Sequence, residues 1–163
     1  MCDRRLARLA KKYQELPGQE LLRYQDSPKT FKVIESGDVN QYLKEITGED
    51  FTAKDFRTWG ATVFAANDLY CLGPAASEQE RKRKISQCVK EIASKLGNTP
   101  AVCRKYYIDP KIIKAYSNNR LFELMNRIDS EDGGNGFFLS REETAVFNLL
   151  NNSRNGRTEL IES

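Results

Sequence analysis

Two short segments carry the residue types from which a reactive site could be built. The first runs from Thr52 to Trp59 and contains Arg57, and the second runs from Leu96 to Pro110 and contains two adjacent tyrosines. The chain has no histidine, which excludes a serine–histidine triad and an imidazole general base. Any chemistry must therefore use tyrosine, lysine, arginine, aspartate or glutamate.

Read without reference to any family, both segments are ambiguous. Arg57 near a helix start fits a surface ion pair, and Tyr107 fits packing along an amphipathic helix. The charge distribution is more informative, because residues 81–120 carry eleven basic and two acidic side chains in a chain of net charge +3. This asymmetry indicates a polyanionic partner, although a basic solvated helix face gives the same pattern.

Together the two segments resemble type IB DNA topoisomerases of the bacterial and poxvirus kind, and more distantly tyrosine recombinases. The step from Lys54 to Arg57 matches the family's (His or Lys)-x-x-Arg element. The Gly-Asn-Thr-Pro run around Asn98 matches a family run that reaches the nucleophilic tyrosine, here Tyr107, nine residues beyond the polar residue. The resemblance concerns the carboxy-terminal part of the catalytic domain and extends to about Tyr116.

The resemblance implies a tyrosine that attacks a DNA phosphodiester, forms a 3′-phosphotyrosyl bond and releases a 5′-hydroxyl. It assigns this role to Tyr107, because Tyr106 fills a position that varies in type. Arg57 would hold the non-bridging phosphate oxygens, and Asn98 would donate a hydrogen bond where some relatives have histidine. Supercoiled DNA would be relaxed without ATP, other nucleotide cofactors or metal, because the covalent bond keeps the phosphodiester energy.

The basic run from Arg81 to Lys114 is expected to contact the phosphates of duplex DNA without reading its sequence. Trp59 is expected to lie in the core and not against a base. The residues predicted to bind DNA are Lys54, Arg81, Lys82, Arg83, Lys84, Arg104, Lys105 and Lys111.

Part of the family's site has no counterpart in the matched segments. The resemblance implies a second arginine and a lysine general acid, both upstream of the matched residues, and Lys11 and Lys12 lie in no matching motif. We therefore expect a fragment, a split subunit or an inactive copy, which would need a missing amino-terminal portion or subunit. The alternatives are a tyrosine recombinase, a DNA-binding module without chemistry and a helical interaction domain.

Composition places the chain among ordinary globular proteins, with 39% hydrophobic residues. No apolar run approaches the roughly 18 residues of a membrane helix, and the charged amino terminus does not read as a signal peptide. Four scattered cysteines without a CxxC pair argue against a zinc site and favour a reducing setting. The expected location is the cytoplasm, in association with the nucleoid.

Periodicity and turn signals predict a mainly helical fold of the topoisomerase IB and tyrosine recombinase kind, with at most a small β-hairpin, at residues 21–34. An amphipathic helix is expected at the amino terminus. A helix over residues 38–46 should end at Gly48, and Thr52 should begin another that reaches residue 72. The residues expected to face inward are Leu6, Leu9 and Tyr13, then Val39, Tyr42, Leu43 and Ile46, then Phe56, Trp59, Val63, Ala66 and Tyr70.

Capping signals predict the remaining helices. Ser77 and Glu80 should form a capping box for a helix that buries Ile85, Cys88, Val89 and Ile92 and ends at Gly97. Pro100 and Pro110 should begin two shorter helices, and Ser140 with Glu143 should begin a last one reaching residue 150, before a polar tail. The expected organisation is a partial catalytic domain at 1–128, a linker at 129–136, and a carboxy-terminal helix with its tail at 137–163.

Overall fold

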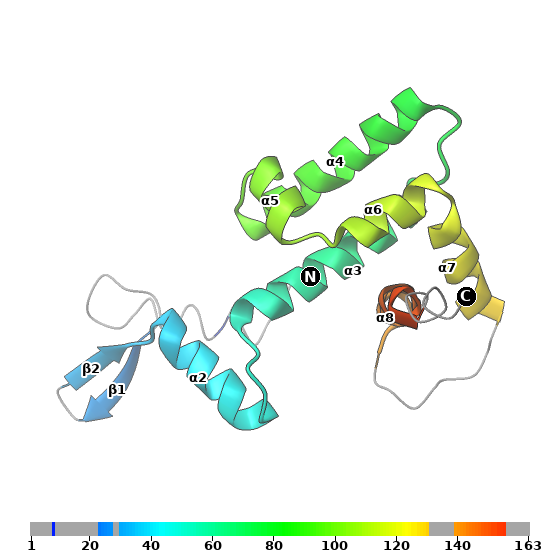
Figure 1. Cartoon of the computed structure of the whole chain (residues 1–163). Coiled ribbons are helices and arrows are strands. Elements are labelled where there is room, and N and C mark those ends of the chain that lie inside the picture. Colours follow the sequence, from blue (N-terminus) through cyan, green and yellow to red (C-terminus); the bar gives the residue numbers. More distant parts are fainter. Residues whose placement is uncertain (1–7, 9–22, 28–29, 131–138, 156–163) are drawn as a thin grey trace, which may run out of the picture. The chain divides into compact units, whose positions relative to one another are not determined.

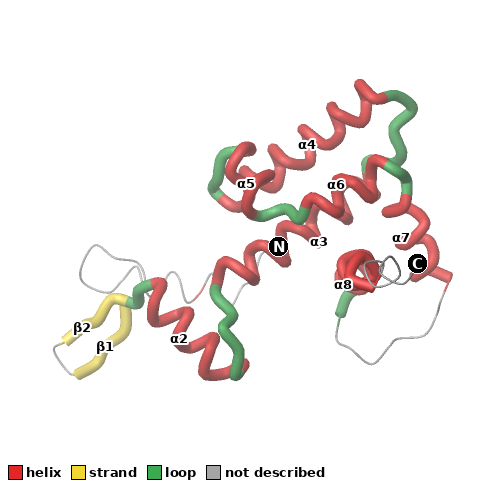
Figure 2. Tube along the Cα trace, in the orientation of Figure 1, coloured by secondary structure: helices red, strands yellow, loops and turns green. Residues whose placement is uncertain are grey.

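The computed structural model describes residue 8 and residues 23–27, 30–130 and 139–155. These residues form one antiparallel hairpin and the helices α2 to α8 (Figure 1, Figure 2). The prediction of a mainly helical fold with a small hairpin is therefore confirmed, whereas the expected amino-terminal helix falls outside the described residues. The chain divides into two compact units, Met1–Ala53 and Lys54–Ser163.

The hairpin of the first unit pairs β1, Arg23–Ser27, with β2, Thr30–Val33. Both strands lie inside the predicted range of residues 21–34. The register shifts between Gln25 and Ser27, so one residue of β1 has no opposite partner, as in a β-bulge.

Helix α2, Ser36–Thr47, follows the hairpin. Its first turn is closed by a capping box between Glu35 and Asp38, in which the Glu35 amide donates to the Asp38 carboxylate at 2.8 Å. It ends as predicted at Gly48, whose φ of 71° is a left-handed conformation that glycine adopts without strain.

The prediction that α2 buries an apolar face is wrong. None of its residues is buried, and the side chains of Tyr42 and Ile46 are 61% and 59% exposed. The described part of this unit offers only one helix and one two-stranded hairpin, and such a small set of elements cannot enclose an apolar stripe. The period of α2 therefore predicted the helix correctly but not its burial.

Helix α3, Ala53–Cys71, begins directly after Thr52, as predicted, and is the first helix of the second unit's core. Its buried face consists of Ala61, Thr62, Ala65, Ala66 and Leu69. Of the five residues expected inward, Ala66 is buried, and Trp59, Val63 and Tyr70 are partly buried against the core. Phe56 is 51% exposed, which corrects the prediction. The face is shifted towards small side chains, which allow neighbouring helices to approach closely.

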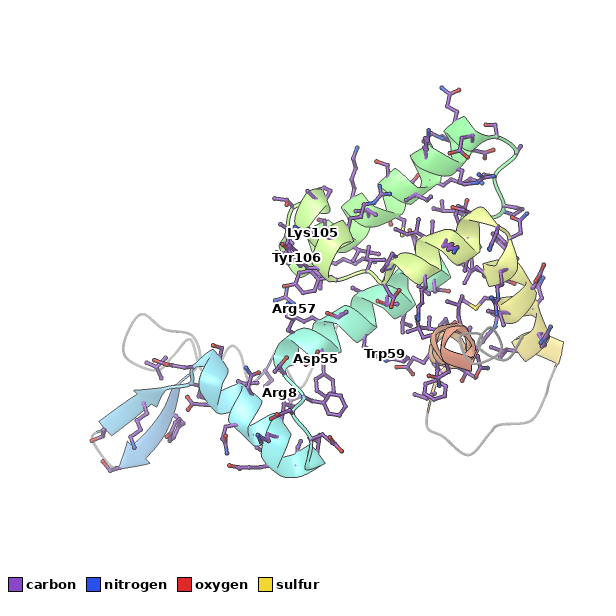
Figure 3. All side chains as sticks on the ribbon, viewed as in Figure 1. Arg8, Asp55, Arg57, Trp59, Lys105 and Tyr106 are labelled. Carbon is purple, nitrogen blue, oxygen red and sulfur yellow. The ribbon has the colours of Figure 1, made fainter. Side chains whose placement is uncertain are left out.

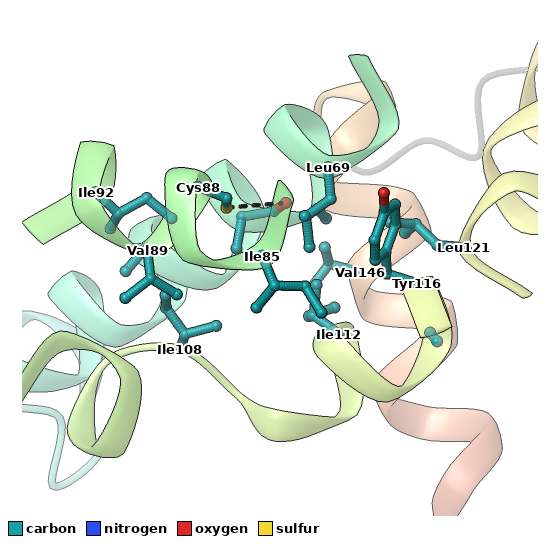
Figure 4. Packing of buried hydrophobic residues seen from close by; sticks show 14 of the residues in the cluster. Leu69, Ile85, Cys88, Val89, Ile92, Ile108, Ile112, Tyr116, Leu121 and Val146 are labelled. Carbon is teal, nitrogen blue, oxygen red and sulfur yellow. Dashed lines mark hydrogen bonds between the residues drawn. The ribbon is translucent and has the colours of Figure 1, made fainter. Parts of the chain in front are cut away.

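Helix α4, Glu78–Leu96, confirms most of its predicted features. Ser77 accepts a hydrogen bond from the Glu80 amide, and Gly97 ends the helix with φ 66°. The Glu80 carboxylate binds the Ala76 amide at 2.8 Å, one residue before the expected partner of a capping box. The predicted stripe is buried and faces the other helices (Figure 4); its residues are Ile85, Cys88, Val89 and Ile92.

Four shorter helices complete the second unit: α5, Pro100–Tyr106; α6, Pro110–Ser117; α7, Arg120–Ser130; and α8, Arg141–Asn155. The proline starts of α5 and α6 and the capping box of Ser140 with Glu143 are confirmed. Helix α7 was not anticipated, and it includes residues 129 and 130 of the expected linker. Helix α8 continues five residues beyond the predicted end, through the polar residues 151–155.

Helix α8 belongs to the core of the second unit. It buries Ala145, Val146 and Leu149 in the same cluster as residues of α3, α4, α6 and α7. The three-part division of the chain at residues 129–136 stays a prediction. Within the described ranges, no helix is both long enough and apolar enough to cross a bilayer.

Candidate functional site

Tyr107 lies at the joint between two short helices. Thr99 caps α5, with its hydroxyl accepting from the Val102 amide, and Pro100 supplies the first helical residue. Pro110 lacks an amide donor and disfavours helix in the residue before it, so α5 ends and α6 begins within three residues. Tyr107 follows the last residue of α5 and is half-buried, with its amide donating to the Cys103 carbonyl at 3.0 Å.

Arg57 approaches Tyr107 from helix α3. The guanidinium carbon of Arg57 lies 5.2 Å from the centre of the Tyr107 ring, a distance at which a cation is attracted to the ring face. Its Nη2 donates a hydrogen bond of 2.8 Å to the carbonyl of Leu96. The side chain of Arg57 is exposed, so it can also reach a molecule that binds from solvent.

Asn98 donates to the same carbonyl oxygen. Its Nδ2 lies 3.2 Å from the Leu96 oxygen, and its amide donates to the Ala93 carbonyl at 2.9 Å. Leu96 is the last residue of α4, where carbonyls lack helical partners and carry partial negative charge. Two side-chain donors from different elements, Arg57 and Asn98, therefore share one oxygen, and the guanidinium of Arg57 also lies over the Tyr107 ring. The three predicted site residues lie together.

Thr62 is a site residue that sequence reasoning missed. Its hydroxyl donates to the Tyr107 carbonyl at 3.3 Å and accepts from the Asp109 amide at 3.2 Å. Its side chain is only 2% exposed. A threonine within the otherwise apolar stripe of α3 was the available signal, because a buried hydroxyl needs a partner.

Tyr106, the residue before Tyr107, is 49% exposed. The ammonium groups of Lys54 and Lys105 lie 5.8 and 4.9 Å from the centre of its ring. Figure 3 shows Arg57 on α3 and Lys105 and Tyr106 on α5 in the same neighbourhood. Three basic side chains, Lys54, Arg57 and Lys105, thus lie around the paired tyrosines, which favours a negatively charged ligand there.

The cluster at residues 81–84 lies near the other end of α4, about 20 Å along the helix from Leu96 at 1.5 Å per residue. Lys84 points inward: its side chain is 12% exposed, and its ammonium binds Glu80 and the carbonyls of Gly73 and Pro74. Lys84 therefore closes the turn between α3 and α4 and does not present its charge to solvent as the DNA-binding prediction required.

The other predicted DNA-binding residues differ in their present contacts. Arg81 and Lys82 pair with Glu78. The Lys111 ammonium lies 3.4 Å from the Leu150 carbonyl of α8. Arg83 and Arg104 have exposed side chains.

Trp59 packs partly against the core, as expected, and its indole nitrogen lies 3.4 Å from the Glu143 carboxylate. A hydrogen bond from the Ser140 amide lowers the pKa of Glu143, and the Trp59 contact adds to this effect. Burial raises the pKa of the Cys88 and Cys103 thiols, so both stay protonated at neutral pH. Neither thiol is therefore a reactive nucleophile.

The chain is similar to known proteins over much of its length. The family described as "Eukaryotic DNA topoisomerase I, catalytic core" matches residues 8–130, which include Arg57, Asn98 and Tyr107. A protein of Acanthamoeba polyphaga mimivirus named DNA topoisomerase 1B is 30% identical over 122 residues, which cover 71% of this chain and 36% of the viral protein. The chain thus spans about a third of the length of that relative.

Proposed function

We propose, from the premise that this chain belongs to the type IB DNA topoisomerase family, that it breaks and rejoins a DNA strand through Tyr107. The observation that carries the proposal is the position of Arg57: it donates to the Leu96 carbonyl together with Asn98, and its guanidinium also lies over the ring of Tyr107. A non-bridging phosphate oxygen would take the place of that carbonyl as their acceptor.

In the proposed reaction the Tyr107 oxygen attacks the scissile phosphorus. A phosphotyrosyl bond forms to the 3′ side, the bond to the 5′-oxygen breaks, and that oxygen leaves as a hydroxyl after accepting a proton. Rejoining is the reverse, with the 5′-hydroxyl attacking phosphorus and the tyrosine leaving. Supercoils can relax between the two steps without ATP, because the phosphodiester energy is kept in the covalent intermediate.

The residues contribute in different ways. A free tyrosine has a pKa near 10 and is a weak nucleophile at neutral pH. The DNA phosphate that it attacks must therefore be made more electrophilic. The Arg57 guanidinium can bind two phosphate oxygens at once and offset the charge of the transition state. The Asn98 amide adds a neutral donor. Lys54 and Lys105, beside Tyr106, would hold neighbouring phosphates of the strand.

In the family the 5′-oxygen receives its proton from a lysine, and a second arginine also binds the phosphate. Both residues lie outside the segments that carry the resemblance. A general acid is typically worth about 10² to 10⁴ in rate, and a lost charge-stabilising donor about 10² to 10³. The 163-residue chain alone should therefore relax supercoiled DNA negligibly. It should need an upstream portion or a separate subunit that carries both groups.

A DNA substrate with a 5′-phosphorothiolate at the scissile bond tests the assignment of Tyr107. Its thiolate leaving group needs no protonation, so the isolated chain should attach to it slowly and covalently. The Tyr107→Phe protein should form no adduct, and the Tyr106→Phe protein, the matched control, should retain it. Adduct that survives in Tyr107→Phe contradicts the assignment, and absence of adduct in all three proteins favours a DNA-binding module without chemistry.

A second substrate distinguishes a topoisomerase from a tyrosine recombinase. When a lysine general acid and a second arginine are supplied by an upstream portion or a separate subunit, relaxation of a supercoiled plasmid without strand exchange between two duplexes is the expected result. Strand exchange would instead indicate a tyrosine recombinase.

A further inference from the structure

Thr62 is a polar residue buried in the otherwise apolar face of α3. Its hydroxyl uses both of its hydrogen-bonding functions on the backbone that follows α5. It donates to the carbonyl of Tyr107 at 3.3 Å and accepts from the amide of Asp109 at 3.2 Å. These two groups belong to the joint between α5 and α6, where no regular helix supplies partners for them.

A threonine inside a helix usually donates to the carbonyl four residues earlier. Thr58 and Thr144 do so, with distances of 2.9 Å to Lys54 and Ser140. Thr62 instead reaches a segment 45 residues later in the chain. Its hydroxyl therefore contributes nothing to α3 itself and connects that helix to the backbone of Tyr107.

The same helix contacts Tyr107 at two places. Arg57 lies over the ring at 5.2 Å, and Thr62, five residues later, holds the carbonyl. Five residues of α-helix rise about 7.5 Å, a fixed spacing as long as α3 stays helical. The position of the tyrosine relative to the arginine is thus set at both its side chain and its backbone by one rigid element.

We propose that Thr62 is a positioning residue, which fixes the backbone of Tyr107 so that its phenol oxygen meets the phosphate held by Arg57. The proposal rests on the proposed function for its catalytic consequence. The hydrogen bonds themselves can be tested without any reaction.

The size of the expected effect follows from geometry. A misplacement of 1 Å in a reacting group can lower a rate by about 10². The 3.3 Å bond to the Tyr107 carbonyl is longer than the usual 2.7–2.8 Å for a hydroxyl donor, so it restrains Tyr107 less firmly than a short bond would. We therefore expect Thr62→Val to lower the attachment rate about tenfold.

The experiment uses the full chain and the 5′-phosphorothiolate DNA at saturating concentration, well below the melting temperature. Thr62→Val removes the hydroxyl with little change in shape, and Thr62→Ser keeps the hydroxyl. Thr144→Val is the matched control, because its hydroxyl binds only its own helix. DNA affinity is measured in parallel, since a positioning residue should change the attachment rate and leave affinity unchanged.

Hydrogen exchange of the Asp109 amide supplies the second measurement. In the wild-type chain this amide should exchange slowly, because Thr62 accepts its hydrogen bond. In Thr62→Val it should exchange at least about tenfold faster, while amides in the middle of α4 keep their protection.

The proposal is supported if Thr62→Val alone attaches slowly, with unchanged DNA affinity, and Thr62→Ser restores the rate. It is overturned if Thr62→Val attaches at the wild-type rate, or if Thr144→Val is equally slow. If the wild-type protein forms no adduct, the proposed function fails for this chain. Hydrogen exchange of the Asp109 amide then tests separately whether Thr62 holds this backbone. An Asp109 amide that exchanges freely in the wild type, or equally in both proteins, overturns the role of Thr62.

Discussion

Replacing Arg57 by glutamine separates a phosphate-binding role from a structural one. In the unbound protein Arg57 donates to the Leu96 carbonyl at the end of α4, so it could serve merely as a helix cap. A hydrogen bond from a charged group to a backbone oxygen stabilises a fold by about 1.5 kcal/mol or less when it is exposed. For a chain of this size that corresponds to a melting temperature lowered by about 3–6 °C.

A catalytic role predicts a much larger change in rate. Loss of one preorganised donor to the transition state typically lowers the rate by about 10² to 10³. A few degrees of lost stability leave nearly all molecules folded at 25 °C and cannot produce such a loss. The expected result for Arg57→Gln is therefore a nearly intact fold with attachment to phosphorothiolate DNA slowed by at least about 10².

The assay is single-turnover adduct formation on a gel, with melting followed by circular dichroism on the same preparations. Arg57→Lys keeps the charge but loses the planar fork, so it should recover only part of the rate. An Arg57→Gln protein that attaches within about threefold of wild type would refute the reasoning. Arg57 would then be a cap for α4 and nothing more.

Three further predictions follow from the charged residues. Lys84→Met should lower the free energy of unfolding by about 1–3 kcal/mol, because the Pro74 carbonyl loses the Lys84 donor and the Gly73 carbonyl keeps only the Tyr116 hydroxyl, while the salt dependence of DNA binding stays unchanged. Lys105→Gln should instead leave stability unchanged and reduce the log–log salt slope of duplex binding by about 0.9, and an unchanged slope would remove Lys105 from the interface. The hydrogen bond from the Ser140 amide holds the pKa of Glu143 below the ordinary value of a glutamate, so its ionised form stabilises α8 above that ordinary pKa and this contribution is lost as pH falls through the lowered pKa. The melting temperature of Glu143→Gln should accordingly depend less on pH below about 5 than that of wild type, and parallel curves would contradict this account.

Local signals in the sequence predicted where most helices begin and end. Ser77, Gly97, Pro100 and Pro110 act through the chemistry of a single turn, a side-chain acceptor, a left-handed conformation or a missing amide. Such effects need no knowledge of distant parts of the chain. At the start of α4 the Glu80 carboxylate binds the amide of Ala76, which changes the expected partner by one residue and leaves the start of the helix where it was predicted.

Burial was harder to predict than helix position. The apolar period of α2 describes a stripe, but whether another element covers that stripe depends on the rest of the fold. In α3 the large side chain of Phe56 is exposed and the small side chains of Ala61 and Ala65 are buried. Hydrophobicity alone predicts that Phe56 is buried ahead of the two alanines. It fails here because closely packed helices favour small side chains at their contacts.

The candidate site was predictable only to the level of side chains in recognisable motifs. Arg57, Asn98 and Tyr107 stand out because their types and spacing match a family pattern. The Leu96 carbonyl cannot be found in this way, since every residue has a carbonyl and only the end of α4 makes this one available. Thr62 lies outside both motifs. The position of Lys84, turned towards the Gly73 carbonyl, likewise depends on a turn whose path the basic run does not encode.

The placement of Arg57 and Thr62 on one helix also limits how the gene can change. Each residue of α-helix turns by about 100°, so a single inserted or deleted codon between them would swing one side chain away from Tyr107. A substitution at the intervening exposed position, Gly60, where an added Cβ would meet nothing within 4 Å, leaves the angle intact. Related genes should therefore differ in sequence at Gly60 but keep four residues between Arg57 and Thr62, and insertions should accumulate elsewhere.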